Sequence, residues 1–170
     1  YSEYIIGSSH ESNGGLVVGG AQVRSGIDGS LVHHVEGDQE DSQFGAHVAG
    51  LSDITGDGEP DFIVGAPKFT TAAGARAGRA VVYSGETGLV RHTFDGPVQG
   101  AWFGSGVAAA GDLNSDGIGD ILVASERDDS LFPGGGKVEV FSGADWSVLY
   151  TWPGSHASQY FGSSVAGGVD

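Results

Sequence analysis

The sequence predicts an all-β protein: a β-propeller built from four-stranded antiparallel blades, with about three blades in the chain. The first observation is a repeat, because Phe-Gly pairs at 44, 103 and 161 recur at offsets of 59 and 58 residues. The second is that each repeat holds four short apolar runs separated by Gly, Asp, Asn and Ser. The third is that no useful stretch shows the period of a helix. Short strands joined by tight turns form one antiparallel sheet, and sheets repeated at this length are typical of propeller blades.

The second repeat defines the strands of a blade most clearly. Its apolar runs are Ala46–Leu51, Phe62–Ala66, Arg79–Tyr83 and Leu89–Phe94. The first run consists mostly of very small residues, which fit where blades converge on the propeller axis, so we expect it to be the innermost strand. The second run is bulky and apolar on both faces, as expected for a central strand packed between neighbouring blades.

The repeat phase divides a single repeat array, residues 1–170, into parts. We expect a first blade without its inner strand at 1–43, a second blade at 44–102, a third at 103–160, and at 161–170 an inner strand that completes another blade. An unpaired strand edge favours association. Three blades are fewer than the usual range of about 4–8. We therefore expect the ring to close either by self-association, as a homodimer with six blades, or through missing repeats of a longer chain.

The composition restricts the partners of this chain. It carries 22 Asp and Glu residues against 7 Lys and Arg, a formal charge of −15, which repels nucleic-acid phosphates and anionic lipid. Such a surface suits metal cations, basic partners or plain solubility. Cysteine is absent, which excludes disulfides and thiolate metal sites. No apolar run approaches the roughly 20 residues of a membrane span, so we expect no membrane insertion.

Phe44-Gly45, followed by Gly-Ala-Pro at 65–67 with an Asp-rich loop between them, resembles the FG-GAP repeat of integrin α-subunits. The resemblance covers essentially the whole chain as nearly three repeats, although Gly-Ala-Pro becomes Gly-Ser-Ser at 7–9 and Ala-Ser-Glu at 124–126. It implies a module for extracellular adhesion, protein–protein interaction or scaffolding that binds an unknown protein ligand. The Ser-Gly turns and the lack of Cys resemble bacterial members of the family, which implies an extracellular or cell-surface location.

Two Asp-rich loops carry oxygen-bearing side chains in the same frame, at positions 1, 3, 5 and 9. These residues are Asp53, Thr55, Asp57 and Asp61 in the first loop and Asp112, Asn114, Asp116 and Asp120 in the second. Position 7, occupied by Glu59 and Ile118, would contribute a backbone carbonyl. Ca²⁺ takes about six to eight hard oxygen ligands, whereas Mg²⁺ prefers a small octahedral shell with retained waters. A single Asp-Gly pair would indicate only a turn, but two equivalent loops in phase with the repeat predict Ca²⁺ sites.

A third calcium loop is predicted only in part. The start of the chain aligns with residues 59–65, which places Glu3 at position 9 of another loop. At the other end, Asp170 falls at position 1. Both residues are candidates for one composite loop, whose middle ligands the chain does not contain.

No catalytic motif accompanies the repeats, since G-x-S-x-G, H-E-x-x-H and P-loop patterns are all missing. A zinc site needs converging ligands, and the six histidines show no helpful spacing beyond the adjacent His33 and His34. We interpret the acidic stretch 36–41 as a solvated turn, with an extra cation site as the alternative. We therefore expect a calcium-binding adhesion or scaffold module and not an enzyme. The alternative is part of a larger secreted hydrolase, either non-catalytic or with its active site at the mouth of the propeller channel.

Overall fold

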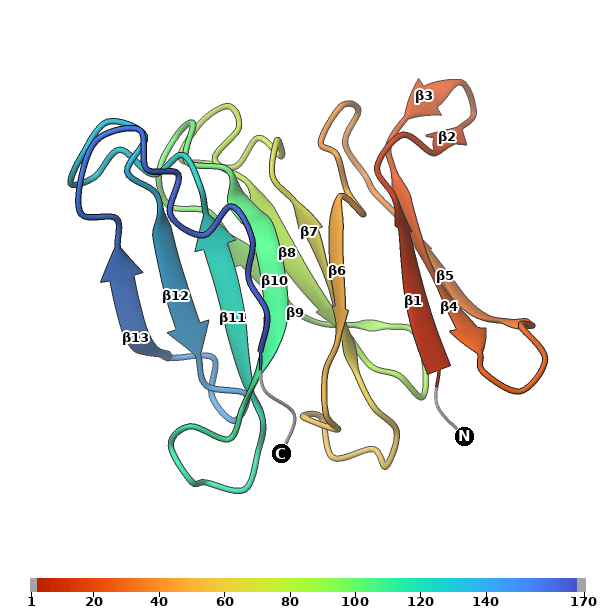
Figure 1. The fold of residues 1–170 in the computed structure, drawn as a ribbon. Coiled ribbons are helices and arrows are strands. Elements are labelled where there is room, and N and C mark those ends of the chain that lie inside the picture. The colour runs from red at the N-terminus through yellow and green to blue at the C-terminus, as the bar shows by residue number, and fades with distance from the viewer. Residues whose placement is uncertain (1–2, 168–170) are drawn as a thin grey trace.

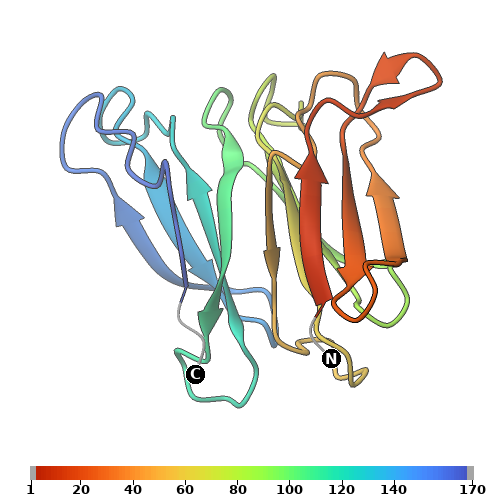
Figure 2. The same cartoon turned by 45° about the vertical axis from the view of Figure 1, so that its right-hand side comes forward.

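The computed structural model describes residues 3–167, and over this range the chain contains β-strands and turns but no helix. Three antiparallel sheets lie side by side like successive blades of a propeller (Figures 1 and 2). The first blade is a three-stranded sheet in the order β1 (Glu3–Ser8), β4 (Gly20–Ser25) and β5 (Leu31–Glu36). A small hairpin, β2 (Ser12–Asn13) and β3 (Leu16–Val17), interrupts it.

The second and third blades each have four strands in sequence order, as predicted. The second blade contains β6 (His47–Gly50), β7 (Phe62–Ala66), β8 (Arg79–Tyr83) and β9 (Val90–Asp95). The third blade contains β10 (Phe103–Gly111), β11 (Asp120–Ser125), β12 (Lys137–Phe141) and β13 (Val148–Pro153). The expected all-β blade architecture is therefore confirmed.

The Phe-Gly pairs form the joints between blades. Each Phe makes an isolated parallel bridge to the residue just before β4, β8 or β12, the last strand but one of the preceding blade. The three bridges are Gly19 to Phe44, Gly78 to Phe103 and Gly136 to Phe161. The glycine that follows each Phe has a positive φ, for example 83° at Gly104, where a Cβ atom would also clash with the Arg79 carbonyl. A side chain is therefore excluded at this joint by both backbone conformation and space.

The apolar core lies between the blades. Ile63 and Val64 are neighbours in β7 and point to opposite faces, and both are fully buried. Ile63 packs in the cluster shared with the third blade and Val64 in the cluster shared with the first. Stacked Phe62 and Tyr83 rings, with centroids 5.1 Å apart, contribute to the latter cluster. The bulky residues of β7 thus pack between neighbouring blades, as the sequence indicated, and β6 forms one edge of its sheet.

Residues 161–167 differ from the expected inner strand. Phe161 makes its bridge to Gly136, but residues 162–167 form a turn and irregular chain. The segment lies against β10, because a Cβ atom at Gly167 would overlap the Ala109 carbonyl (Figure 1). A ladder requires a partner, and no second strand of a following blade is present among residues 3–167. Residues 168–170 lie outside the described part, so the completion of another blade stays a prediction.

Candidate functional site

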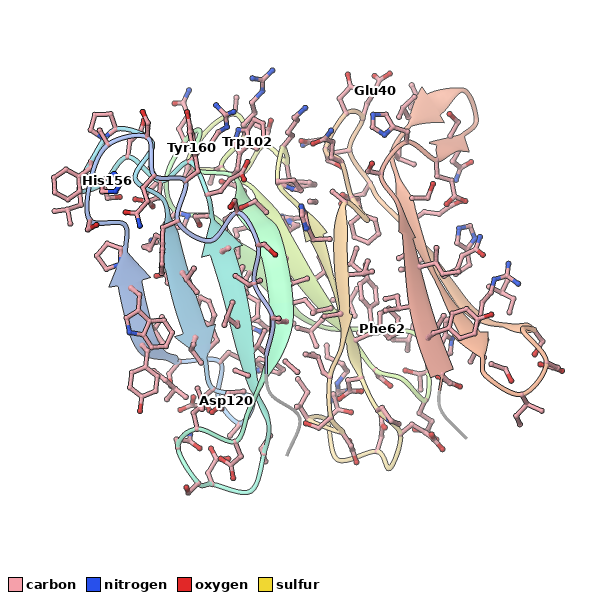
Figure 3. The ribbon with its side chains drawn as sticks, viewed as in Figure 1. Glu40, Phe62, Trp102, Asp120, His156 and Tyr160 are labelled. Carbon is pink, nitrogen blue, oxygen red and sulfur yellow. The ribbon has the colours of Figure 1, made fainter. Side chains whose placement is uncertain are left out.

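The two predicted calcium loops occupy equivalent places in successive blades. The first connects β6 to β7 and the second connects β10 to β11, and both emerge at the same end of the sheets, the lower end in Figures 1 and 3. Each loop therefore joins the edge strand that begins its blade to the second strand of the same sheet. Any ion held there is coupled to the blade core through these two strands.

The carboxylates at position 9 are buried and tie each loop to a turn elsewhere in the same blade. Asp61 is 1 % exposed; its Oδ2 accepts hydrogen bonds from the amides of Ile54 and Thr55, both at 2.9 Å. Its Oδ1 accepts a bond of 3.0 Å from the amide of Gly85. Burial raises the pKa of the Asp61 carboxyl group, while these amide bonds oppose the rise.

Asp120 repeats this arrangement in the third blade. It is also 1 % exposed, and it accepts bonds from the amides of Leu113, at 2.8 Å, and Gly143, at 3.3 Å. Ser-Gly pairs recur in phase with the repeat at 25–26, 84–85 and 142–143, and this contact explains the glycines of the last two pairs. A Cβ atom at Gly85 or Gly143 would clash with a loop carbonyl and push the turn away from the carboxylate.

The carboxylates at position 1 fold the loops back on themselves. Asp53 accepts the amides of Gly56 and Gly58, at 2.7 and 2.9 Å, and Asp112 accepts that of Gly117 at 2.8 Å. The glycines at position 6 have φ values of 98° at Gly58 and 88° at Gly117, which confirms the need for glycine at the sharp turn.

The middle ligands of the first loop form a cluster of oxygens. Thr55 Oγ1 lies 2.8 Å from Asp57 Oδ2 and 3.3 Å from Asp61 Oδ1. The Ser84 hydroxyl donates to the same Asp57 oxygen at 2.7 Å and is the main cause that lowers the pKa of Asp57. Sequence reasoning did not include Ser84 in the site, although its Ser-Gly pair recurs in phase with the loops and was the available signal.

The second loop is more open. The Asn114 amide nitrogen donates to Asp116 Oδ2 at 2.7 Å, and the Asp116 carboxylate is exposed. At position 7 the two loops differ, since Glu59 is exposed whereas the Ile118 side chain packs against the core between the second and third blades. Ile118 thus anchors its loop through an apolar contact.

The donor set of the first loop fits Ca²⁺. Oxygens bound to one Ca²⁺ at about 2.3–2.6 Å lie roughly 2.8–3.5 Å apart, and Thr55 Oγ1 has this spacing to one oxygen of Asp57 and one of Asp61. All donors are hard oxygens. Asp53 instead points its carboxylate at loop amides, so it would have to turn to complete a shell. Among residues 3–167, the His, Asp and Glu ligand atoms that converge within 4.8 Å of one another belong to a different group, formed by Glu11, His34 and Glu36.

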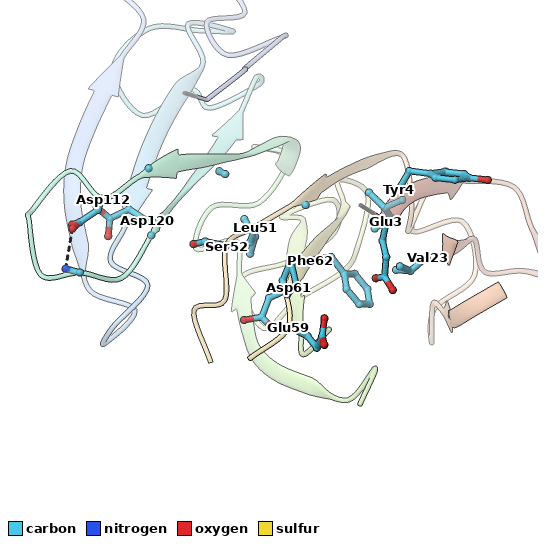
Figure 4. Close-up of a pocket in the computed structure, with 17 residues that line it drawn as sticks. Glu3, Tyr4, Val23, Leu51, Ser52, Glu59, Asp61, Phe62, Asp112 and Asp120 are labelled. Carbon is cyan, nitrogen blue, oxygen red and sulfur yellow. Dashed lines mark hydrogen bonds between the residues drawn. The ribbon is translucent and has the colours of Figure 1, made fainter. Parts of the chain in front are cut away.

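A cleft of about 800 Å³ separates the two loops (Figure 4). Its walls combine carboxylates from both loops, including Asp61 and Asp112, with the ring of Phe62. Glu3, proposed at position 9 of a composite third loop, lies at the start of β1 and lines this cleft. Its proposed partner Asp170 lies outside the described residues.

Comparison with known proteins identifies the repeat. A family described as the FG-GAP repeat matches residues 44–83, which run from the joint before β6 to the end of β8. Over 98% of its length the chain is 30% identical to integrin alpha-6 of Gallus gallus and to integrin alpha-E of Homo sapiens. It is 33% identical to integrin alpha-6 of Homo sapiens over 81% of its length. The chain spans only 16%, 15% and 12% of these three relatives, respectively.

The described residues contain no helix that is long and apolar enough to cross a membrane. The FG-GAP match, the alignment with integrin α-subunits along nearly the whole chain and the blade architecture agree with one another. The chain therefore belongs to the FG-GAP repeat family and is a relative of the integrin α-subunits.

Proposed function

We propose that this chain is a calcium-stabilised propeller module that serves extracellular or cell-surface adhesion, protein–protein interaction or scaffolding, and not catalysis. One observation carries the proposal. Two loops with the same oxygen frame lie at the same hairpin of successive blades, and in both the carboxylate at position 9 is buried and bonded to a distant turn. The similarity to integrin α-subunits supports the adhesive role.

Calcium would stabilise the fold by relieving the repulsion between the loop carboxylates and by linking the loop to the rest of its blade. Without a cation, Asp53, Asp57 and Asp61 concentrate negative charge around a single turn. An ion shared by these side chains and Thr55 would fix the loop to β7 and to the turn at Ser84. Extracellular calcium modules have Kd values on the order of 10⁻⁴–10⁻³ M, so a tenfold excess of Ca²⁺ would add about 1.4 kcal/mol per site.

Other residues that suggested chemistry have structural roles. His33 lies at the joint between the first two blades, with its Nε2 atom 2.6 Å from the Gly85 carbonyl oxygen. His92 stacks on Trp146 with ring centroids 4.5 Å apart. Neither imidazole is paired with a nucleophile, which favours binding over catalysis.

Calorimetry of Ca²⁺ binding to metal-free protein tests this proposal. We expect two saturable sites, with one lost in the double variant Asp112→Asn/Asp116→Asn and a rise in melting temperature on adding Ca²⁺. Glu86→Gln is the matched control, since Glu86 is an exposed carboxylate outside both loops and should leave binding unchanged. The absence of saturable binding at millimolar Ca²⁺, or equal binding by the double variant, would refute the calcium sites.

The outer faces of the first and third blades expose large apolar side chains. Tyr4 and Ile6 are 46% and 48% exposed, and Tyr150 and Trp152 are 46% and 45% exposed. Such faces favour burial against another blade. We propose that further repeats of a longer chain, or a second copy that forms a six-bladed homodimer, cover them. Light scattering in millimolar Ca²⁺ distinguishes the two, because a homodimer has twice the chain mass and a clean monomer excludes it.

A further inference from the structure

One position recurs in all three blades, where the last strand but one (β4, β8 or β12) begins beside the end of the last strand (β5, β9 or β13). The paired residues are Gly20 and Glu36, Arg79 and Asp95, and Lys137 and Pro153. A loop residue is bonded next to each pair, because its carbonyl accepts a 3.0 Å hydrogen bond from the amide just before β4, β8 or β12. These loop residues are Glu11, Phe69 and Asp128. The backbone thus builds the same small niche three times.

In the second and third blades a basic side chain fills this niche. Arg79 Nε lies 2.6 Å from Asp95 Oδ1, and the guanidinium stacks over the Phe69 ring at 3.8 Å. Lys137 Nζ lies 3.4 Å from Asp128 Oδ2 and 3.2 Å from a Glu139 oxygen. In both blades the niche therefore holds a positive charge supplied by the chain itself.

The first blade has a glycine at this position and therefore lacks the basic side chain. The Glu11 carboxylate takes its space, because a Cβ atom at Gly20 would overlap Glu11 Oε2. His34 and Glu36 are two residues apart on β5 and point to the same face. His34 Nε2 lies 2.8 Å from Glu11 Oε1, and ligand atoms of Glu11, His34 and Glu36 all lie within 4.8 Å of one another.

The β2–β3 hairpin helps to orient this cluster. The Asn13 side-chain amide donates to the Glu36 carboxylate, which is the kind of supporting bond that holds metal-ligating carboxylates in place. The Glu11 and His34 side chains are 24% and 31% exposed, so an ion could reach them. The cluster adjoins the β2–β3 hairpin, at the end of the blades opposite the calcium loops (Figure 1), and so it is independent of those loops.

We propose that Glu11, His34 and Glu36 form a binding site for Zn²⁺, which takes the place of the basic side chain found in the other two blades. One imidazole nitrogen and two carboxylates are a donor set that Zn²⁺ accepts, at about 2.0–2.2 Å, with a fourth position open. The imidazole separates this site chemically from the all-oxygen loops, which suit Ca²⁺. Zn²⁺ would also neutralise the two carboxylates that no Lys or Arg approaches in this niche of the described structure.

Zinc titration of the chain in millimolar Ca²⁺, which saturates the loops, tests this site. We expect one Zn²⁺ per chain by calorimetry, with affinity weakened at least about tenfold by His34→Gln and by Glu36→Gln. His10→Gln is the matched control, because His10 is outside the cluster, and it should bind as the parent does. Substituting Co²⁺ should give the visible absorption of a metal bound to nitrogen and oxygen, and the signal should disappear in His34→Gln.

Two outcomes overturn the proposal. One is the absence of saturable Zn²⁺ binding at concentrations up to about 100 μM. This concentration is far above the Kd expected of a site with three protein ligands. The other is Zn²⁺ binding that His34→Gln and Glu36→Gln both leave unchanged. Near-ultraviolet circular dichroism of each variant in Ca²⁺ confirms folding, and Glu11→Gln provides a third variant if one of the others is unfolded.

Discussion

The replacement Asp61→Asn separates the structural role of the loop from its ion binding. The carboxylate accepts the amides of Ile54 and Thr55 on one oxygen and of Gly85 on the other. Asn offers a single oxygen, so at least the Gly85 amide loses its acceptor and faces an NH₂ group. A hydrogen bond to a charged group contributes about 1.5–3 kcal/mol. Because burial raises the pKa of Asp61, removing the charge recovers part of this loss, and we expect a net destabilisation of about 2 kcal/mol.

Urea unfolding followed by tryptophan fluorescence measures this effect, first in EDTA and then in millimolar Ca²⁺. In EDTA only the lost amide bonds act, so Asp61→Asn should be about 2 kcal/mol less stable while the control Glu86→Gln stays within about 0.5 kcal/mol of the parent. In Ca²⁺ the difference should widen by about 1.4 kcal/mol, the contribution expected from one lost site. Equal stability of Asp61→Asn and the parent in EDTA would refute the tie between loop and turn.

Three further perturbations test the packing described above. Lys137→Met removes the cation beside Asp128, which is only 4 % exposed, and should destabilise the fold by about 2–4 kcal/mol in calorimetry; no change would contradict the pairing. Gly104→Ala places a Cβ atom in a crowded joint at φ 83° and should lower the free energy of unfolding by more than about 2 kcal/mol. Gly100→Ala, at φ 77° but with open space around it, should lower it by about 1 kcal/mol. Equal losses would refute the steric argument. Burial lowers the pKa of His92, so its contribution to stability is present above the unfolded pKa of about 6.5 and is lost as pH falls from 6.5 through its lowered value; an NMR titration midpoint at or above 6.5 would contradict this.

Much of the architecture follows from short-range patterns in the sequence. Tight turns and short apolar runs can be recognised from neighbouring residues, and the recurrence of Phe44 and Phe103 sets the phase of the repeat. Together they predicted the four-stranded blades and the positions of both Asp-rich loops. The sequence showed that the Ser-Gly pair recurs but not why it does. The tertiary structure explains the recurring Ser-Gly pair, because the Gly85 amide donates a hydrogen bond to the buried carboxylate of Asp61, 24 residues away.

Convergence of side chains from separate strands required the tertiary structure. Glu11 lies in the loop between β1 and β2, whereas His34 and Glu36 lie on β5, and the fold brings their ligand atoms within 4.8 Å of one another. The spacing of the histidines gave no sign of this. Residues 162–167 carry a strand-like sequence but form no strand in the structure, because a ladder needs backbone partners that local sequence does not supply. The sequence by itself determined the repeat, its strands and the composition of the loops, because these can be recognised from the order of residues along the chain. Only the tertiary structure decided which carboxylates are buried and bonded and which groups meet at one point, since these depend on how the blades pack.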